Sequence, residues 1–426
     1  MQKLRNASEM FVDYKQPLKV INTIFLCWGL MSVVNGLLLN EFGMAIGLEK
    51  SQISLFAYMF FGTYFIFGIP AAYIVNKFGF KQSIEYGLIT SASAVFFMVA
   101  GARMQSVPII LLGIFVQVVG FTILQVACNP YIIFTGHPKQ GATRLSFAGA
   151  HNSIGSWIAP LIGILISNIT IPENISTDIQ AIITYKTEFI VLPYVLITVV
   201  FAGLAVLVHF SDLPDFNDFH DIEPDAEGSE KRTSILQYKH IWFAFFAIFA
   251  YVGAEVGIMS SLGSYLQGHL SGTPLEDSIT FIAPYFLGAM IIGRFIGGHM
   301  LRTSSPVRVL KLFSLFAFLL TIVSILLDTH EGMFSILALG FFNGVMWPII
   351  FTLAVQGMGR LVPYISGFLI MGIVGGALIK YLMNIWVINP ETGFMTISQF
   401  LYIPAGLYLV LLAYSFWGHE YKKKTA

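Results

Sequence analysis

The feature that most constrains this chain is a series of apolar runs, each about as long as a membrane span. A helix needs roughly 20 apolar residues to cross about 30 Å of hydrocarbon. Of the 426 residues, 56% are hydrophobic and 11% are charged, and the mean hydropathy is +0.77. We therefore predict an all-α membrane protein with twelve transmembrane helices, at residues 18–46, 52–76, 82–101, 107–135, 144–170, 188–210, 238–268, 277–301, 307–327, 332–357, 363–386 and 396–417.

The same composition argues against several classes of function. The formal net charge is 0, so electrostatics gives no support for a nucleic-acid partner. Cys27 and Cys128 both lie inside apolar runs, which predicts packed small side chains rather than a disulfide or a metal site. The sequence has no GxxxxGK(S/T) phosphate-binding run, so we expect neither an enzyme nor a pump driven by ATP. The first apolar run begins near Leu18 and continues as a full span, which argues against a cleavable signal peptide.

An acidic, proline-containing segment at 211–237 separates the sixth predicted span from the seventh. It divides the chain into an N-terminal six-helix lobe, 1–210, and a C-terminal six-helix lobe, 238–426. The lobes share spacings: Gln125 lies five residues before Pro130, Asn343 lies five before Pro348, and matching features recur at offsets of about 216 to 225 residues. Two parallel six-helix pseudo-repeats around a central site are a plan of secondary transporters.

Lysine and arginine are distributed unevenly over the predicted connections between spans. Eighteen of them fall on the side of the termini, and three, Lys50, Arg103 and Lys186, fall on the other side. Basic residues are enriched in cytoplasmic loops. We therefore predict that both termini and the 211–237 linker lie in the cytoplasm.

Gln125 and Asn129 are the first candidates for a substrate site. They are four residues apart in the apolar run "GFTILQVACNPYIIF", so a helix places them on one face, and Pro130 follows directly. Each amide can donate and accept hydrogen bonds, which suits the hydroxyls of a sugar. The alternative is a polar contact between helices, worth about 1 kcal/mol in a membrane. We favour a cavity, because Pro130 interrupts the hydrogen bonds of the helix beside the two amides.

Asn343 and Trp347 have the same four-residue spacing in the tenth span, again directly before a proline. An indole ring can pack against the apolar face of a sugar while amides bind its hydroxyls. Asn35 in the first span and Asn152 in the fifth complete the predicted substrate site. The segment around Asn152, "FAGAHNSIGSW", is also rich in small residues that favour close helix packing.

Two ionisable residues are candidates for cation coupling. Glu255 lies within the apolar run "YVGAEVGIMSSLGSYL", where an unpaired charge is costly, so we expect it to bind an ion or a proton. His151 is the second candidate, although a single helical histidine is more often structural. Arg294 lies toward the cytoplasmic end of the eighth span, and we interpret it as a side chain that reaches the membrane surface.

These residues belong to motifs that resemble the fucose:proton symporter family of the major facilitator superfamily, and within it the glucose/galactose transporter branch. The resemblance covers nearly the whole chain and rests on "CWG", "QVACNPY", "HNSIGSWIAPLIG", "YVGAEV", "GRFIGG" and "GFFNGVMWPIIFTL". It implies the major facilitator fold and cation-coupled uptake of monosaccharides through the bacterial inner membrane, by alternating access of the two lobes. The sequence departs from the family in four places. The span-one acid is Gly36, the span-four acid is Gln125, His151 replaces an aromatic residue, and Lys380 replaces a proline.

We therefore predict a monomeric, multi-pass transporter of a hexose or a related deoxy or amino sugar. No resident cofactor is expected, and the coupling ion would be Na⁺ or H⁺. Two alternatives remain open at this stage. One is a sugar uniporter or an exporter of another polar solute, and the other is a sugar receptor that does not transport.

Overall fold

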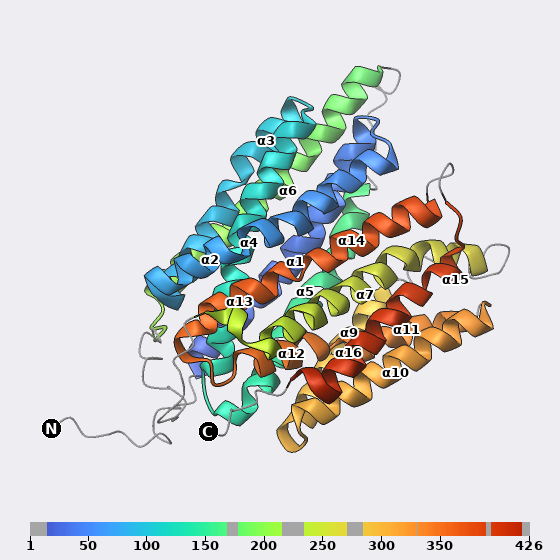
Figure 1. The fold of residues 1–426 in the computed structure, drawn as a ribbon. Coiled ribbons are helices and arrows are strands. Elements are labelled where there is room, and N and C mark those ends of the chain that lie inside the picture. Colours follow the sequence, from blue (N-terminus) through green and yellow to red (C-terminus); the bar gives the residue numbers. More distant parts are fainter. Residues whose placement is uncertain are drawn as a thin grey trace, which may run out of the picture.

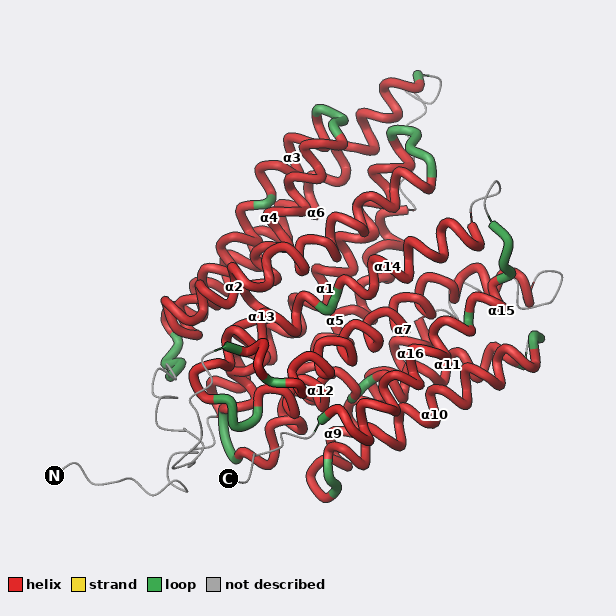
Figure 2. Tube along the Cα trace, viewed as in Figure 1, coloured by secondary structure: helices red, strands yellow, loops and turns green. Residues whose placement is uncertain are grey.

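The computed structural model describes residues 15–167, 178–214, 234–270, 284–329, 331–388 and 393–419. Within these residues the chain forms helices and connecting segments without a strand (Figures 1 and 2). The main helices are α1 (Lys15–Ala45), α2 (Lys50–Ser93), α3 (Val95–Arg103), α4 (Val107–Phe134), α5 (Gly141–Ser167), α6 (Ile179–Phe210), α7 (Lys239–Leu270), α9 (Pro284–Thr303), α10 (Pro306–Leu327), α11 (Gly332–Asn343), α12 (Met346–Val355), α13 (Val362–Met371), α14 (Val374–Met383) and α16 (Tyr402–Ala413). The short α15 (Ile397–Phe400) precedes α16.

The helices agree with the predicted spans. Among the described residues, nine helical segments are long and apolar enough to cross a membrane, and one of them covers 52–103. That segment contains two helices that meet at Gly79, whose φ of 77° and ψ of 175° are not helical. With α5 and α9, which lie at the fifth and eighth predicted spans, the arrangement is consistent with twelve spans. Most of the predicted 211–237 linker, residues 215–233, lies outside the described residues.

Proline shapes two similar segments differently. Pro130 lies inside the unbroken helix α4. Before Pro348, by contrast, the helix stops at Asn343 and resumes at Met346, so the tenth span consists of α11 and α12. A proline at 348 cannot donate to the carbonyl of residue 344, which favours a break at this position. Asn343 and Trp347 therefore do not share one continuous helical face, contrary to the prediction.

Two sets of helices pack around the centre of the protein. In the first, α2 packs on α4 and α6, and α1 packs on α5; in the second, α7 packs on α14 and α16, and α10 packs on α11 and α16. The sets meet where α5 contacts α9 and where α2 contacts α13. Glycine permits the second contact, because a Cβ on Gly367 would lie only 2.3 Å from the carbonyl oxygen of Gly68.

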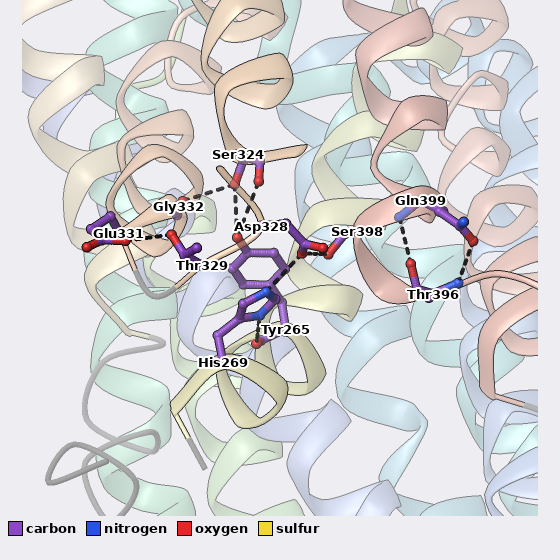
Figure 3. Close-up of polar contacts among 10 residues, drawn as sticks. All are labelled: Tyr265, His269, Ser324, Asp328, Thr329, Glu331, Gly332, Thr396, Ser398 and Gln399. Atoms are coloured by element: carbon purple, nitrogen blue, oxygen red, sulfur yellow. Dashed lines mark hydrogen bonds and ion pairs between the residues drawn. The ribbon is translucent and has the colours of Figure 1, made fainter. Parts of the chain in front are cut away.

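A polar cluster joins three helices at the end of the molecule opposite the start of α1 (Figure 3). Asp328, the residue after α10, accepts a hydrogen bond from Ser398 of α15, and its Oδ1 lies 3.0 Å from Nε2 of His269 on α7. Asp328 has a left-handed φ of 40°, which ends α10. The hydrogen bond from Ser398 is the main cause that lowers the pKa of Asp328, and the hydrogen bond and charge of His269 act in the same direction.

Candidate functional site: a central polar cavity

A cavity of about 240 Å³ lies between the two sets of helices. Side chains from α1, α2, α4 and α5 line it on one side, and side chains from α7, α9 and α12 line it on the other. The volume is slightly below the roughly 300–1,000 Å³ of pockets for drug-sized ligands. A site of this size and position suits one small solute held between two sets of helices.

Amide groups form the cavity wall on α4. Asn129 is only 1% exposed, and its Nδ2 donates to Oε1 of Gln125 over 3.3 Å. The phenol of Tyr64, on α2, faces the same Gln125 amide. The structure therefore brings Gln125 and Asn129 together at the cavity, as their spacing predicted. The contribution of Tyr64 was not predicted, because nothing in the sequence links it to α4.

Asn152 lines the cavity from α5 and also fixes the contact between α5 and α1. Its Nδ2 donates to the carbonyl oxygen of Phe25 over 3.1 Å. A Cβ on Gly29 would lie 2.0 Å from the Asn152 carbonyl oxygen, so only glycine allows this approach. The sequence predicted both a polar residue at the site and close helix packing in this segment. In the structure Asn152 does both.

Charged groups line the opposite wall. Glu255 of α7 and Arg294 of α9 both border the cavity and interact electrostatically. Both residues lie in the part of the chain that the structure describes, and their charged atoms do not come within 4.0 Å of each other. The hydroxyl of Tyr251, one helical turn before Glu255, faces this carboxylate without hydrogen-bond geometry and has no partner among the described residues. This wall therefore combines a carboxyl group, a guanidinium and an unpaired hydroxyl.

Arg294 lies at the site rather than at the membrane surface, which corrects the interpretation from the sequence. Its Nη1 donates to the carbonyl oxygen of Gly149 on α5, in the other set of helices. Two glycines make room for it, since a Cβ on Gly149 would lie 2.5 Å from Nη1 and a Cβ on Gly344 would lie 2.8 Å from its backbone nitrogen. The Nε of Arg294 is buried without a hydrogen-bond partner among the described residues. The sequence did not predict this role of Arg294, because the position of a residue along a span does not show which helices lie beside it.

Aromatic rings border the polar groups. Trp347 lines the cavity from α12, stacks on Phe351 with 6.1 Å between ring centroids, and lies 6.3 Å from the ring of Tyr251. Trp28 lines it from α1 and packs in an edge contact on Phe25. Trp347 occupies the position that the sequence suggested, whereas Trp28 was present in the "CWG" motif without an assigned role.

Three predicted site residues lie elsewhere. Asn343 does not line the cavity; it is fully buried, and its Oδ1 accepts a 2.8 Å hydrogen bond from Tyr408 of α16. Asn35 is 1% exposed and accepts a 3.0 Å hydrogen bond from Tyr194 of α6. His151 does not line the cavity either, and its Nδ1 lies 2.8 Å from the Phe147 carbonyl oxygen, one turn back on α5. The two asparagines act as polar contacts between helices, which was the alternative considered for such residues.

This arrangement defines a class of protein. Amides, opposite charges and aromatic faces meet between two sets of membrane-spanning helices. Among the described residues, no group of three His, Cys, Asp or Glu side chains could hold a metal ion. These features are those of a secondary transporter, in which a solute site lies between two helical repeats.

Comparisons with known proteins agree with this class. The family model described as Major Facilitator Superfamily matches residues 20–379. The chain is 32% identical to the glucose/galactose transporter of Brucella abortus over 373 residues, which is 87% of this chain and 88% of that protein. It is 27% identical to the L-fucose-proton symporter of Escherichia coli over 387 residues, 87% of each chain.

The solved structures give the same result for the fold. A crystal structure of the transporter FucP in the outward conformation superposes with a TM-score of 0.82 and 25% identity, covering 96% of this chain and 100% of FucP. This chain belongs to the Major Facilitator Superfamily. The family and fold predicted from the sequence motifs are confirmed, and the protein is a transporter rather than an enzyme.

Proposed function

We propose that this protein takes up a monosaccharide through the bacterial inner membrane by cation-coupled symport. The observation that carries the proposal is the composition of the cavity: Gln125, Asn129 and Asn152 offer amides, while Trp28 and Trp347 offer aromatic faces. Hydroxyls and apolar ring faces alternate on a sugar, so such a lining is complementary to it. The names of the relatives, a glucose/galactose transporter and an L-fucose-proton symporter, support a sugar as substrate.

The packing between the helix sets supports transport by alternating access. Gly68 and Gly367 touch, Ser146 donates to the Arg294 carbonyl oxygen over 2.8 Å, and Phe147 packs on Phe295. Ser146 and Phe147 lie in the first half of α5, and Arg294 and Phe295 lie in the second half of α9, and these halves lead to the side of the termini. We infer that the cavity is closed on this side, as expected for a protein that resembles FucP in the outward conformation. Opening of these contacts would release the sugar to the cytoplasm.

Glu255 is the proposed site of the coupling cation. The resemblance to the fucose-type symporters implies acids in spans one and four, where this chain has Gly36 and Gln125, and neither of these residues can bind a proton. Glu255 is a carboxylate at the cavity, where a bound Na⁺ or proton would neutralise it at low cost. The bound ion would then cross the membrane together with the sugar.

Sugar counterflow in proteoliposomes tests the transport function. Labelled glucose, galactose and fucose are each offered to vesicles preloaded with the same unlabelled sugar, after a thermal-shift screen has ranked the sugars by binding. We expect labelled sugar to accumulate transiently for the sugars that bind. A receptor that does not transport would bind sugar in the thermal-shift screen and give no counterflow.

Gradient-driven uptake tests the coupling. We expect Glu255→Gln to lose accumulation driven by a Na⁺ or proton gradient and to keep counterflow, because exchange needs no net ion movement. His151→Phe is the matched control, since His151 lies outside the cavity lining, and it should accumulate sugar like the parent. If the parent does not respond to either gradient, the protein is a uniporter.

The proposed orientation places both termini and residues 211–237 in the cytoplasm, and the proposed working unit is a monomer. The orientation is supported by eighteen basic residues on that side against three on the other. Single cysteines at Ser229 and Lys231, which lie outside the described residues, should resist a membrane-impermeant reagent in intact cells. Cysteine at Met104, which is 67% exposed at the opposite end, should react. The reverse labelling pattern would overturn the orientation.

A further inference from the structure

Arg294 lies between two groups that can accept hydrogen bonds from its guanidinium. One is the carbonyl oxygen of Gly149, on the other set of helices, to which Nη1 donates. The other is the carboxylate of Glu255, which interacts electrostatically with Arg294 but lies beyond the 4.0 Å limit for an ion pair. Arg294 is held between these partners in a position where Nε lacks a hydrogen bond. The guanidinium is therefore shared between the cavity wall and the contact between helix sets.

We propose that Arg294 is a positioning residue that links the charge of Glu255 to the closing of the helix sets on the side of the termini. This inference rests on the proposed cation site at Glu255. When Glu255 is neutral, because it is protonated or its charge is offset by a bound cation, Arg294 bonds to Gly149 and keeps α9 against α5. When Glu255 is ionised and free, it draws the guanidinium away from Gly149 and the contact is released.

The charge balance around Glu255 makes this competition effective. The ionisable groups that interact with Glu255 are Tyr251 on its own helix, Arg294 on α9 and Tyr408 on α16. Arg294 is the only one of the three that is a cation at neutral pH. Because hydrogen bonds between charged groups are stronger than those to neutral acceptors, a full charge on the carboxylate competes strongly with a neutral carbonyl for the same guanidinium.

The geometry also explains why the competition reaches the helix contact. Nη1 packs so closely on Gly149 that a Cβ there would lie 2.5 Å from it, and a shift of the guanidinium toward Glu255 would therefore break the bond to α5. The backbone of Arg294 joins the same contact, because its carbonyl oxygen accepts a hydrogen bond from Ser146. Ser146 contacts the residue but not its guanidinium, and it therefore offers a matched control.

The experiment measures the distance between spin labels at Met104 and Thr329, two exposed positions at the end opposite the termini, one in each set of helices. The full chain is reconstituted in nanodiscs, and pulsed electron resonance is recorded at pH 5.5 and pH 8.5. A protein closed on the side of the termini gives the longer distances. We expect Glu255→Gln to increase the long-distance population and Arg294→Gln to reduce it at least threefold.

The double variant and the control complete the test. Glu255→Gln combined with Arg294→Gln should match Arg294→Gln alone, because Glu255 acts through the arginine. The parent and Ser146→Ala should both give more of the long distances at pH 5.5 than at pH 8.5, because protonation neutralises Glu255, and Arg294→Gln should lose this response. The inference is overturned if both single variants shift the distances in the same direction, if neither does, or if their effects add. These distances do not depend on sugar accumulation, so they separate this inference from failure of the proposed symport.

Discussion

Replacement of Asn343 and of Gln125 by alanine should have opposite consequences, although the sequence presents them as equivalent. Asn343 is fully buried and accepts a 2.8 Å hydrogen bond from Tyr408, whereas Gln125 lines the cavity. Asn343→Ala removes that bond and leaves the Tyr408 hydroxyl buried without a partner. We therefore expect Asn343→Ala to lower the free energy of unfolding and to leave sugar affinity unchanged.

The magnitude follows from the burial of the pair. A buried polar group left without its partner costs about 1–3 kcal/mol in soluble proteins. Hydrogen bonds between membrane helices average about 0.6 kcal/mol and reach about 1.7. For this fully buried pair we expect a loss of about 1–2 kcal/mol. Tyr408→Phe removes the donor of the same bond and should cause a loss of similar size.

Gln125→Ala should instead act on binding. The loss of one amide contact to a sugar hydroxyl corresponds to about 0.5–1.5 kcal/mol, or about a two- to tenfold weaker affinity. Stability should change little, because the Gln125 side chain lies at the cavity, where water can replace its contacts.

Unfolding by SDS in mixed micelles measures the first effect, and calorimetric titration with the sugar that binds measures the second. The reasoning fails if Asn343→Ala weakens sugar affinity tenfold at unchanged stability. It also fails if Gln125→Ala binds sugar like the parent. Either result would mean that the described cavity is not where the sugar binds.

Three further predictions concern the aromatic wall, the helix contact and the polar cluster. Trp347→Ala should weaken sugar affinity more than Trp347→Phe, because phenylalanine keeps an aromatic face; equal losses in calorimetric titration would contradict stacking on this ring. Gly367→Ala should slow counterflow at least tenfold, because its Cβ would lie 2.3 Å from the carbonyl oxygen of Gly68, while Gly203→Ala, with open space around its Cβ, should transport like the parent. Asp328 has a lowered pKa, so its ionised form stabilises the folded state above about pH 4, the value in the unfolded chain, and this contribution is lost as pH falls further. Asp328→Asn should therefore lower stability at pH 7, and its difference from the parent in SDS unfolding should shrink as pH falls below about 4; a difference that does not change with pH would refute this.

The sequence alone determined the helices of the fold, because the composition of each segment shows whether it lies in lipid or in water. Apolar runs long enough to cross hydrocarbon predicted α1, α4 and α7 closely, and the gap between the second and third spans contains the break at Gly79. Local spacing also predicted the Gln125 and Asn129 pair, because residues four apart on an unbroken helix share a face. Where the helix is broken, the same spacing gave a wrong face: Asn343 ends α11, and Trp347 belongs to α12.

Only the tertiary structure decided which polar residues meet. Asn35 and Asn343 carry the same amide as Asn129, yet tyrosines on distant helices bind them away from the cavity. Glu255 has no basic neighbour in sequence, but the packing of α9 brings Arg294 to the same cavity. A side chain's depth in the membrane can be read from its place along a span. Its partners depend on how each helix is rotated and on which helices lie beside it, and those are set by packing between segments far apart in the chain.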